Sequence, residues 1–359
     1  MRAILFLTCF QYEYSIFISP NERGTGVATY DYAHFNEEIL KNNSVLFARE
    51  SSRNKLGLAR FSERFSINFY NAKEDLYEML RENNVELCYH LIPGKTHSQP
   101  CYRRPEGCRI VYHCVFSTKD PAGDVYAPIS RFLNDRDGTS FPVVPHMIHL
   151  PEHDRDMREE LGIPADAIVF GRHGGSCKFN VEFAHRLIRE IVDEKPNIYF
   201  LMLNTDQFCE PHPQIIHLPV CYDLDEKVRF INTCDAMLHA RKGGETFGIA
   251  VGEFSIKNKP VITFYPPQSG WECIVYRLKQ AFNSATKMAQ RLPVSPACEH
   301  INILGDKALT FYTEKRLRSL LLDFDRDWGR QQHWDAYSGN YNPTAVMKQF
   351  DQVFIQAKD

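Results

Sequence analysis

Short apolar runs separated by amphipathic segments recur along the whole chain. In its first part the runs lie at residues 2–8, 44–48, 85–90, 109–114, 124–130 and 143–148. Continuous apolar runs of this length are typical of strands that are buried on both faces of a parallel sheet. Residues 29–40 and 72–83, between such runs, have the spacing of helices. Strands that alternate with helices predict a doubly wound α/β sheet.

The same alternation continues in the second part of the chain. Further strands are predicted at residues 167–170, 198–203, 215–218, 236–240 and 259–264. Helices are predicted at residues 154–161, 181–194, 223–234, 278–292 and 313–324. The tail at 342–354 begins with a cap-like Asn-Pro pair and carries apolar residues at helical spacing, which indicates a packed helix.

The length of the chain favours two domains. A chain of 359 residues is long for one hydrophobic core and natural for two cores of about 150–180 residues each. A polar linker near residues 150–153 suggests where the first domain ends. We therefore expect domains at 1–150 and 151–338, followed by a closing helix at 339–359.

The segment from Arg241 to Glu253 carries the main candidate chemistry, because it lies between two predicted strands. Its glycine pair, Gly243-Gly244, is expected to open into a helix, where exposed N–H groups would suit an anion such as a diphosphate. Glu245 lies at this entrance, and Glu253 follows a little over two helical turns later, roughly on the same face. Two carboxylates above a diphosphate are well placed to hold sugar hydroxyls.

Other candidates follow predicted strands, where doubly wound sheets bind their ligands. Gly24-Thr25-Gly26 comes after the first strand, although an ordinary tight turn explains such glycines equally well. Gly171-Arg172 and Lys178 come at and after the first strand of the second domain. His90, His113 and Ser130 are expected at strand ends, where a lone histidine is more often structural than functional.

These motifs resemble the retaining, GT-B fold glycosyltransferases of the GT4-type family. The Glu245–Glu253 pair matches the family's Glu-x7-Glu pattern in its setting Gly-Glu-Thr-Phe-Gly…Gly-Glu. Arg172 with Lys178 resembles the family's basic pair, and Gly24–Val27 its glycine-rich loop. The resemblance covers nearly the whole chain. Two departures bear on the identity of the sugar: His239-Ala240-Arg241-Lys242 replaces the usual Pro-Ser, and Gly174-Gly175-Ser176-Cys177 is less usual.

The resemblance implies a fold and an activity. It implies two Rossmann-like doubly wound domains that face a cleft, with residues 1–150 on the acceptor side and 151–338 on the donor side. The helix at 339–359 would cross back to the first domain. The implied reaction moves a sugar from a nucleotide-diphosphate sugar to a hydroxyl of a glycan or lipid-linked acceptor. The anomeric configuration would be retained, with a diphosphate oxygen as the base.

The resemblance also assigns roles to individual residues. Glu245 would bind donor sugar hydroxyls, His113 would contact the donor sugar or phosphate, and Arg172 and Lys178 would neutralise the leaving diphosphate. Glu253 would bind the ribose of the nucleotide. Donor-binding roles are further implied for Gly24, Thr25, Gly26, Gly171, Gly244, Thr246, Phe247, Gly248 and Ile249. No cofactor or metal is expected, because no Asp-x-Asp motif lies at a strand end in a sugar-binding context and the two cations would do a metal's work.

Composition narrows the choice of partners. A net charge of −3 gives no overall basic field for nucleic acid, and no apolar run approaches the roughly 20 residues of a spanning helix. The 11 cysteines form no Cys-x-x-Cys pair, which predicts reduced thiols in a cytoplasmic protein. Peripheral membrane contact stays open, because many relatives use lipid acceptors.

Several alternatives share the same architecture. A nucleotide-sugar epimerase would need an acid and a base at the sugar ring, which the sequence does not assign. A phosphorylase would need a pyridoxal phosphate lysine, and none stands out. A nucleotide-sugar-binding protein with a decayed site is disfavoured by the intact Glu245, Glu253, Arg172 and Lys178. No Gly-x-Gly-x-x-Gly follows the first strand of either domain, which disfavours a dinucleotide-dependent dehydrogenase.

Overall fold

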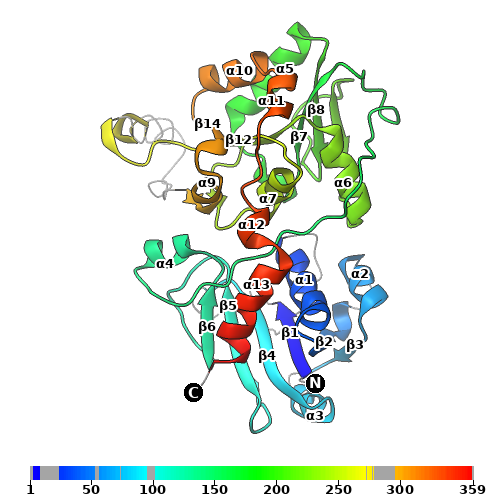
Figure 1. Cartoon of the computed structure of the whole chain (residues 1–359), viewed down its shortest axis with the longest axis vertical. Coiled ribbons are helices and arrows are strands. Elements are labelled where there is room, and N and C mark those ends of the chain that lie inside the picture. Colours follow the sequence, from blue (N-terminus) through cyan, green and yellow to red (C-terminus); the bar gives the residue numbers. More distant parts are fainter. Residues whose placement is uncertain are drawn as a thin grey trace. The chain divides into compact units, whose positions relative to one another are not determined.

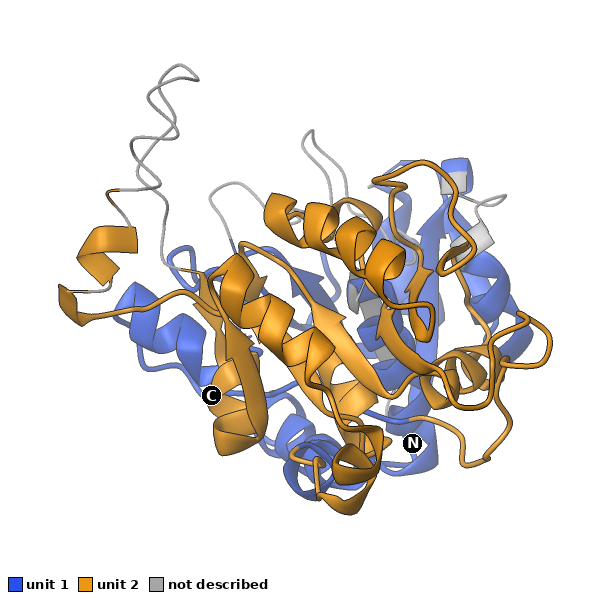
Figure 2. Cartoon of the chain, turned by 90° about the horizontal axis from the view of Figure 1, so that it is seen from above, with its two compact units in different colours: residues 1–149, 337–359 blue, residues 150–336 orange. Residues whose placement is uncertain are grey.

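The chain folds into two compact units, each built around its own parallel sheet (Figures 1 and 2). The computed structural model describes residues 3–8, 24–52, 56–72, 74–94, 102–271, 273–276, 278 and 296–357. Unit 1 comprises residues 1–149 and 337–359, and unit 2 comprises residues 150–336. These boundaries lie beside the expected domain limits at residues 150 and 338.

The sheet of unit 1 has six parallel strands in the order β3-β2-β1-β4-β5-β6. This is the order of a Rossmann-type sheet, in which the chain winds outward from β1 in both directions. The strands are β1 (Ala3–Thr8), β2 (Asn43–Arg49), β3 (Ile67–Tyr70), β4 (Val85–Ile92), β5 (Arg109–Cys114) and β6 (Val125–Pro128). The helices before the connection to unit 2 are α1 (Gly24–Glu38), α2 (Leu56–Arg64), α3 (Asp75–Glu82) and α4 (Arg131–Asp137), with a 3₁₀ turn η1 (Glu50–Ser52).

The C-terminal tail belongs to unit 1, where it forms α12 (Ser338–Tyr341), α13 (Pro343–Phe350) and a π-helical turn η4 (Asp351–Ile355). The predicted cap is present, because Oδ1 of Asn342 accepts a hydrogen bond from the backbone N–H of Ala345 at 2.9 Å. The apolar stripe packs inward, and the Phe350 ring stacks on Tyr32 of α1 with 5.3 Å between centroids.

Unit 2 repeats the architecture with six parallel strands in the order β14-β12-β10-β7-β8-β9. The strands are β7 (Ile168–Arg172), β8 (Ile198–Leu203), β9 (Ile215–Leu218), β10 (Ala236–His239), β12 (Val261–Phe264) and β14 (Ala308–Phe311). A separate parallel pair joins β11 (Gly244–Glu245) to β13 (Ala297–Cys298). The helices are α5 (Glu182–Glu194), α6 (Leu224–Thr233), α7 (Ile249–Ile256), α9 (Glu299–Leu304), α10 (Glu314–Leu322) and α11 (Arg326–Gln331), with 3₁₀ turns η2 (Ser176–Lys178) and η3 (Gly305–Lys307).

The main core of unit 2 lies between its sheet and helices α5 and α10. It contains alternate residues of the strands, such as Phe170 and Phe200, against Leu187 and Ile191 of α5 and Leu317 of α10. Helices α6 and α7 cover the other strand positions. Both faces of the sheet are therefore covered, which explains why its strands are nearly continuous apolar runs.

Two of the predicted elements do not form. Residues 143–148 form no strand, because a proline has no backbone N–H to donate to a neighbouring strand. The segment is buried and held by isolated hydrogen bonds, such as that from the backbone N–H of Val144 to the carbonyl of Pro128 at 3.0 Å. Residues 154–161 form turns and no helix. Their contacts are to residues distant in the sequence: the backbone N–H of Met157 donates to the Thr233 hydroxyl, and the Arg158 guanidinium donates to the Asp235 carboxylate. The elements that were not predicted are α2, β3, α4, β11, β13, α9, β14 and α11. Most of the helix predicted at 278–292 lies outside the described residues.

Candidate functional site

The site is built at the carboxyl edge of the unit 2 sheet. Arg172 ends β7, His239 ends β10, and Thr263 lies one residue before the end of β12. Because the strands are parallel, all three residues reach the same edge, which is where ligands bind in doubly wound sheets. Glu245 follows β10 and lies in the short strand β11.

Glu245 is held by two basic side chains that converge on one of its oxygens. Oε1 forms an ion pair with Nη1 of Arg241 and lies 3.3 Å from Nε2 of His239. Among the described residues, no donor reaches Oε2. The side chain is 23% exposed, so this second oxygen remains available to a ligand.

The surroundings of Glu245 keep it ionised. Burial alone would raise the pKa of this carboxyl group, but the hydrogen bond from His239 and the charge of Arg241 outweigh it and lower the pKa to about 2. A carboxylate that is fully ionised at neutral pH can only accept hydrogen bonds, which suits the hydroxyl groups of a sugar.

Glu253 lies in α7 and is almost completely buried. Its Oε1 accepts a hydrogen bond from Nζ of Lys227 at 2.8 Å, and its Oε2 lies 3.0 Å from Nε2 of His173 without the alignment of a hydrogen bond. Burial lowers the pKa of His173 despite the nearby carboxylate, so Lys227 is the cation that pairs with Glu253 at neutral pH. Burial opposes ionisation of Glu253, but these neighbours lower its pKa to about 2.

The local geometry around the two carboxylates differs from the sequence prediction. Helix α7 begins at Ile249, with Gly248 as its N-cap in the left-handed region at φ 93°, and Glu245 belongs to a strand. The glycine pair at 243–244 therefore does not open into the helix, and the prediction that Glu245 and Glu253 share a helical face was wrong. Gly244 is instead required for strand pairing: its φ is 59°, and an added Cβ would lie 1.8 Å from the carbonyl oxygen of Ala297.

Of the remaining donor-binding candidates of this segment, Thr246, Phe247 and Gly248 lie in the turn that joins β11 to α7, and Ile249 is the first residue of α7. Thr246 and Ile249 are half-buried, and Phe247 is 2% exposed. The turn positions them beside Glu245, and their contacts with a donor stay a prediction.

Arg172 braces two loops at the carboxyl edge. Its guanidinium donates hydrogen bonds to the carbonyl of Asn204 at 2.9 Å, the hydroxyl of Thr205 at 2.6 Å and the carbonyl of Gly175 at 2.6 Å. Burial lowers the pKa of Arg172 to about 10, and the Glu245 carboxylate opposes this shift. Arg172 is thus a buried cation close to Glu245, with its donors directed at the protein.

Lys178 and Gly171 have contrasting environments. Lys178 is exposed at the end of η2, and its ammonium makes no ion pair with any described residue, so it is available to an anion. Gly171 lies within β7, where an added Cβ would come within 2.2 Å of the Cys234 sulfur. Close packing of α6 on the sheet is therefore sufficient reason for a glycine at this position.

The remaining candidates belong to unit 1 and are distant in the sequence from the unit 2 sheet. His113 is fully buried in β5, and its ring nitrogens are 2.7 Å from the Tyr89 hydroxyl and 2.6 Å from the Val144 carbonyl. A donor contact would require one of these bonds to be replaced, which favours the structural role. Gly24, Thr25 and Gly26 form the first turn of α1; the carbonyl of Thr25 accepts a hydrogen bond from the Thr29 hydroxyl at 2.9 Å.

No protein-family model matches the sequence, and no curated protein matches it either. Solved structures match nearly the whole chain. A glycosyltransferase from Rickettsia africae ESF-5 gives a TM-score of 0.60 at 12% identity over 99% of this chain and 98% of its own. Sucrose-phosphate synthase from Thermosynechococcus elongatus gives 0.62 at 11% identity over 99% of both chains. HepE from Anabaena, solved with UDP, gives 0.59 at 10% identity over 99% of this chain and 100% of its own.

The chain has the GT-B fold. Its two Rossmann-type units, each with a six-stranded parallel sheet, are the expected architecture. Identities this low establish the fold alone, so the activity and the roles of the site residues rest on the site itself.

Sequence reasoning missed the residues that surround the two glutamates. His239 was noticed only as a departure from a motif, and Thr263, His300, Lys227 and His173 were not singled out. Two of them carried a usable sequence signal, because His239 and Thr263 each lie near the end of a predicted strand. In the structure they lie opposite each other in adjacent parallel strands. His300 carried none, because the apolar pattern loosens after β12.

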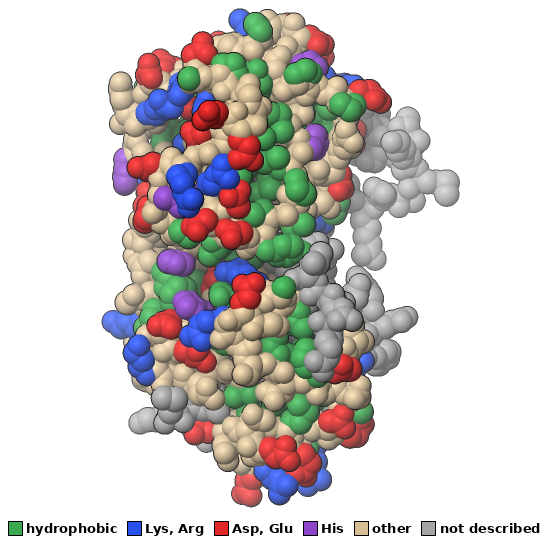
Figure 3. Space-filling view, turned by 90° about the vertical axis from the view of Figure 1, so that its right-hand side faces the viewer, with side chains coloured by type: hydrophobic (Ala, Val, Ile, Leu, Met, Phe, Trp, Pro, Cys, Tyr) green, Lys and Arg blue, Asp and Glu red, His purple; other side chains and the backbone are tan. Residues whose placement is uncertain are grey.

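The surface and the helices add little to the choice of ligand. On the face drawn in Figure 3, Lys and Arg side chains are interspersed with Asp and Glu, and no large area has one sign. Among the described residues, no three or more His, Cys, Asp or Glu side chains are grouped to hold a metal ion. None of the described helices combines the length and apolar character needed to cross a membrane.

Proposed function

We propose that this protein is a glycosyltransferase that moves a sugar from a nucleoside diphosphate sugar to a hydroxyl acceptor. The observation that carries the proposal is the position of Glu245 in a GT-B fold: an ionised carboxylate at the carboxyl edge of the unit 2 sheet, with one oxygen anchored and the other open. Donor binding in such a sheet is expected at this edge.

The groups around Glu245 fit the parts of such a donor. Lys178 supplies an exposed cation for the diphosphate, and Arg172 shapes the loop that carries it. The resemblance implies that Glu253 binds the ribose; because its Oε2 is buried 3.0 Å from Nε2 of His173, that contact would require His173 to be displaced. HepE has been solved with UDP and with UDP-glucose, and MnaA from S. aureus with UDP, which supports a uridine nucleotide as the first donor to test.

The finer parts of the proposal rest on the resemblance in the sequence. They are a GT4-type enzyme, retention of anomeric configuration, independence of metal ions, a glycan or lipid-linked acceptor and a place in the cytoplasm. In a retaining reaction the departing diphosphate would carry the developing negative charge. Lys178 would stabilise that charge, and Glu245 would hold the sugar in orientation.

Turnover assays test the proposal most simply. We expect donor hydrolysis or transfer with wild-type protein, and a loss of about 100-fold or more in Glu245→Gln, which keeps the shape of the side chain and removes its charge. Glu159→Gln, an exposed glutamate elsewhere in unit 2, is the matched control. Unchanged turnover in Glu245→Gln would contradict the site assignment.

The stereochemistry and the metal requirement need their own measurements. NMR of the first-formed product gives its anomeric configuration, and retention predicts that of the donor. Turnover that persists in EDTA is expected. A product that is an epimer of the donor sugar, formed without an acceptor, would show that the protein is an epimerase.

A further inference from the structure

Three polar side chains that no sequence motif marks lie behind Glu245 and are linked to it. His239 and Thr263 come from neighbouring strands of the unit 2 sheet, and His300 comes from α9. All three are buried, with exposed fractions of 6%, 0% and 0%. The segment that carries His300 also carries β13, which pairs with the strand of Glu245.

The links form a continuous chain. Nε2 of His239 lies 3.3 Å from Oε1 of Glu245, and Nδ1 of the same ring lies 2.8 Å from the Thr263 hydroxyl. That hydroxyl lies 3.2 Å from Nε2 of His300. The rings of His239 and His300 are in edge contact, with 5.1 Å between centroids.

The ionised state of Glu245 fixes the direction of the first link in this chain. A carboxylate only accepts, so Nε2 of His239 must donate to it. Nδ1 of the same ring and Nε2 of His300 both lie within hydrogen-bond distance of the Thr263 hydroxyl, which can donate to one of them and accept from the other.

We propose that His239, Thr263 and His300 form a positioning chain that anchors Oε1 of Glu245 and thereby directs Oε2 at the donor sugar. The inference rests on the proposed function and deepens it, because it names the residues that set the contact with the sugar moiety. His239 acts through Glu245 and does not itself touch the substrate. Arg241 anchors the same oxygen from the exposed side, which leaves the buried side to the histidine.

Packing alone does not account for these side chains. A buried polar chain costs desolvation free energy that apolar residues of the same volume would avoid. This chain ends on a carboxylate that is partly exposed, and Glu245 has no other anchor on the buried side among the described residues. Holding a reacting group in one geometry is what such supporting hydrogen bonds contribute to a site.

The test compares sugar binding with nucleotide binding in matched variants. His239→Leu removes the donor and keeps the bulk, whereas His239→Gln keeps an N–H that can reach Glu245. Thr263→Val removes the hydroxyl at nearly constant volume. Each protein is titrated calorimetrically with UDP, GDP and ADP and with the glucose conjugate of each, after thermal unfolding has shown that it is folded.

We expect His239→Leu to weaken binding of the glucose conjugate about 10- to 100-fold and to leave that of the free nucleotide within about twofold. His239→Gln should restore most of this loss, and Thr263→Val should lose about 2- to 10-fold. Equal weakening of both ligands in His239→Leu would indicate a merely structural role and overturn the inference while leaving the proposed function standing. If His239→Leu does not fold, wild-type binding of the conjugate by Thr263→Val overturns it. Silence of the wild-type protein towards the whole panel would overturn the proposed function, and this inference with it.

Discussion

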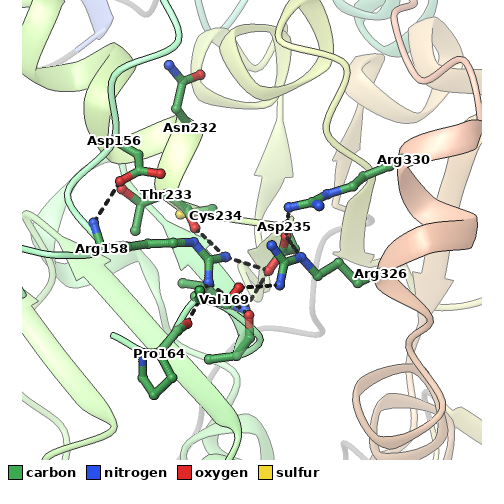
Figure 4. A network of polar contacts seen from close by, with 12 residues as sticks. Asp156, Arg158, Pro164, Val169, Asn232, Thr233, Cys234, Asp235, Arg326 and Arg330 are labelled. Carbon is green, nitrogen blue, oxygen red and sulfur yellow. Dashed lines mark hydrogen bonds and ion pairs between the residues drawn. The ribbon is translucent and has the colours of Figure 1, made fainter. Parts of the chain in front are cut away.

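Asp235 holds together the amino edge of the unit 2 sheet and provides the sharpest stability prediction (Figure 4). The side chain is 3% exposed, and Oδ2 accepts hydrogen bonds from the backbone N–H of Val169 and from Arg158, both at 2.9 Å. Oδ1 lies 3.1 Å from Nε of Arg326 and 3.5 Å from Nη2 of Arg330. Three cations and one backbone donor therefore depend on a single carboxylate.

The size of the effect follows from what each substitution leaves behind. Removing one partner of a buried ion pair typically costs about 3–5 kcal/mol. Arg158 keeps hydrogen bonds to the carbonyls of Ala167 at 2.9 Å and Thr233 at 3.0 Å, so we expect Asp235→Ala to lie near the lower limit, about 3 kcal/mol. Arg330 is 58% exposed, and Arg330→Ala should cost less than about 1 kcal/mol.

Tryptophan fluorescence during urea unfolding measures the free energy of unfolding of unit 2 alone. The chain has 3 tryptophans, Trp271, Trp328 and Trp334, and all lie within this unit. The midpoint should fall strongly in Asp235→Ala and hardly at all in Arg330→Ala, with the slope unchanged. A loss below about 1 kcal/mol in Asp235→Ala, or equal losses in the two variants, would refute the claim that the buried carboxylate organises this edge.

Two further predictions concern the backbone and pH. Gly244→Ala must displace the Ala297 carbonyl and adopt an unfavourable positive φ, so we expect thermal unfolding to show a loss of about 1–3 kcal/mol in the free energy of unfolding. In the control variant Gly339→Ala an added Cβ meets nothing within 4 Å, so this substitution should be neutral or stabilising. Burial lowers the pKa of both His90 and His146 to about 3, against an ordinary value of about 6.5, so the unfolded chain binds more protons between these values and stability falls as pH falls. Calorimetry should show a loss of about 2 kcal/mol for each histidine between pH 6.5 and 5, and His146→Gln should flatten this dependence; a pH-independent wild type would contradict the prediction.

The alternation of apolar runs and helices was sufficient to predict the doubly wound sheets, because strands covered on both faces lack polar positions. The same rule failed at residues 143–148, which are apolar because they are buried and not because they form a strand. An apolar pattern indicates burial, but a buried segment that contains proline lacks the backbone N–H it needs to pair with a neighbouring strand.

The local geometry of the candidate site could not be predicted from the sequence. Glu245 was predicted at the entrance of a helix, but it lies in a strand that depends on pairing with residues 297–298, which are far away in the sequence. Contacts of this kind leave no local periodicity. For the same reason His300 could not be predicted, although it ends the chain of contacts behind Glu245.

The central claim, a nucleoside diphosphate site at the carboxyl edge of unit 2, is tested most directly by titrating UDP into wild-type protein and Lys178→Ala. The Lys178 side chain is exposed and makes no hydrogen bond or ion pair with a described residue, so its loss should leave the fold intact. Lys195→Ala, another exposed lysine, which follows α5 at the opposite edge of the sheet, is the control. The account predicts metal-independent binding that Lys178→Ala weakens about 10-fold or more and Lys195→Ala leaves unchanged. Equal affinities in all three proteins would contradict it.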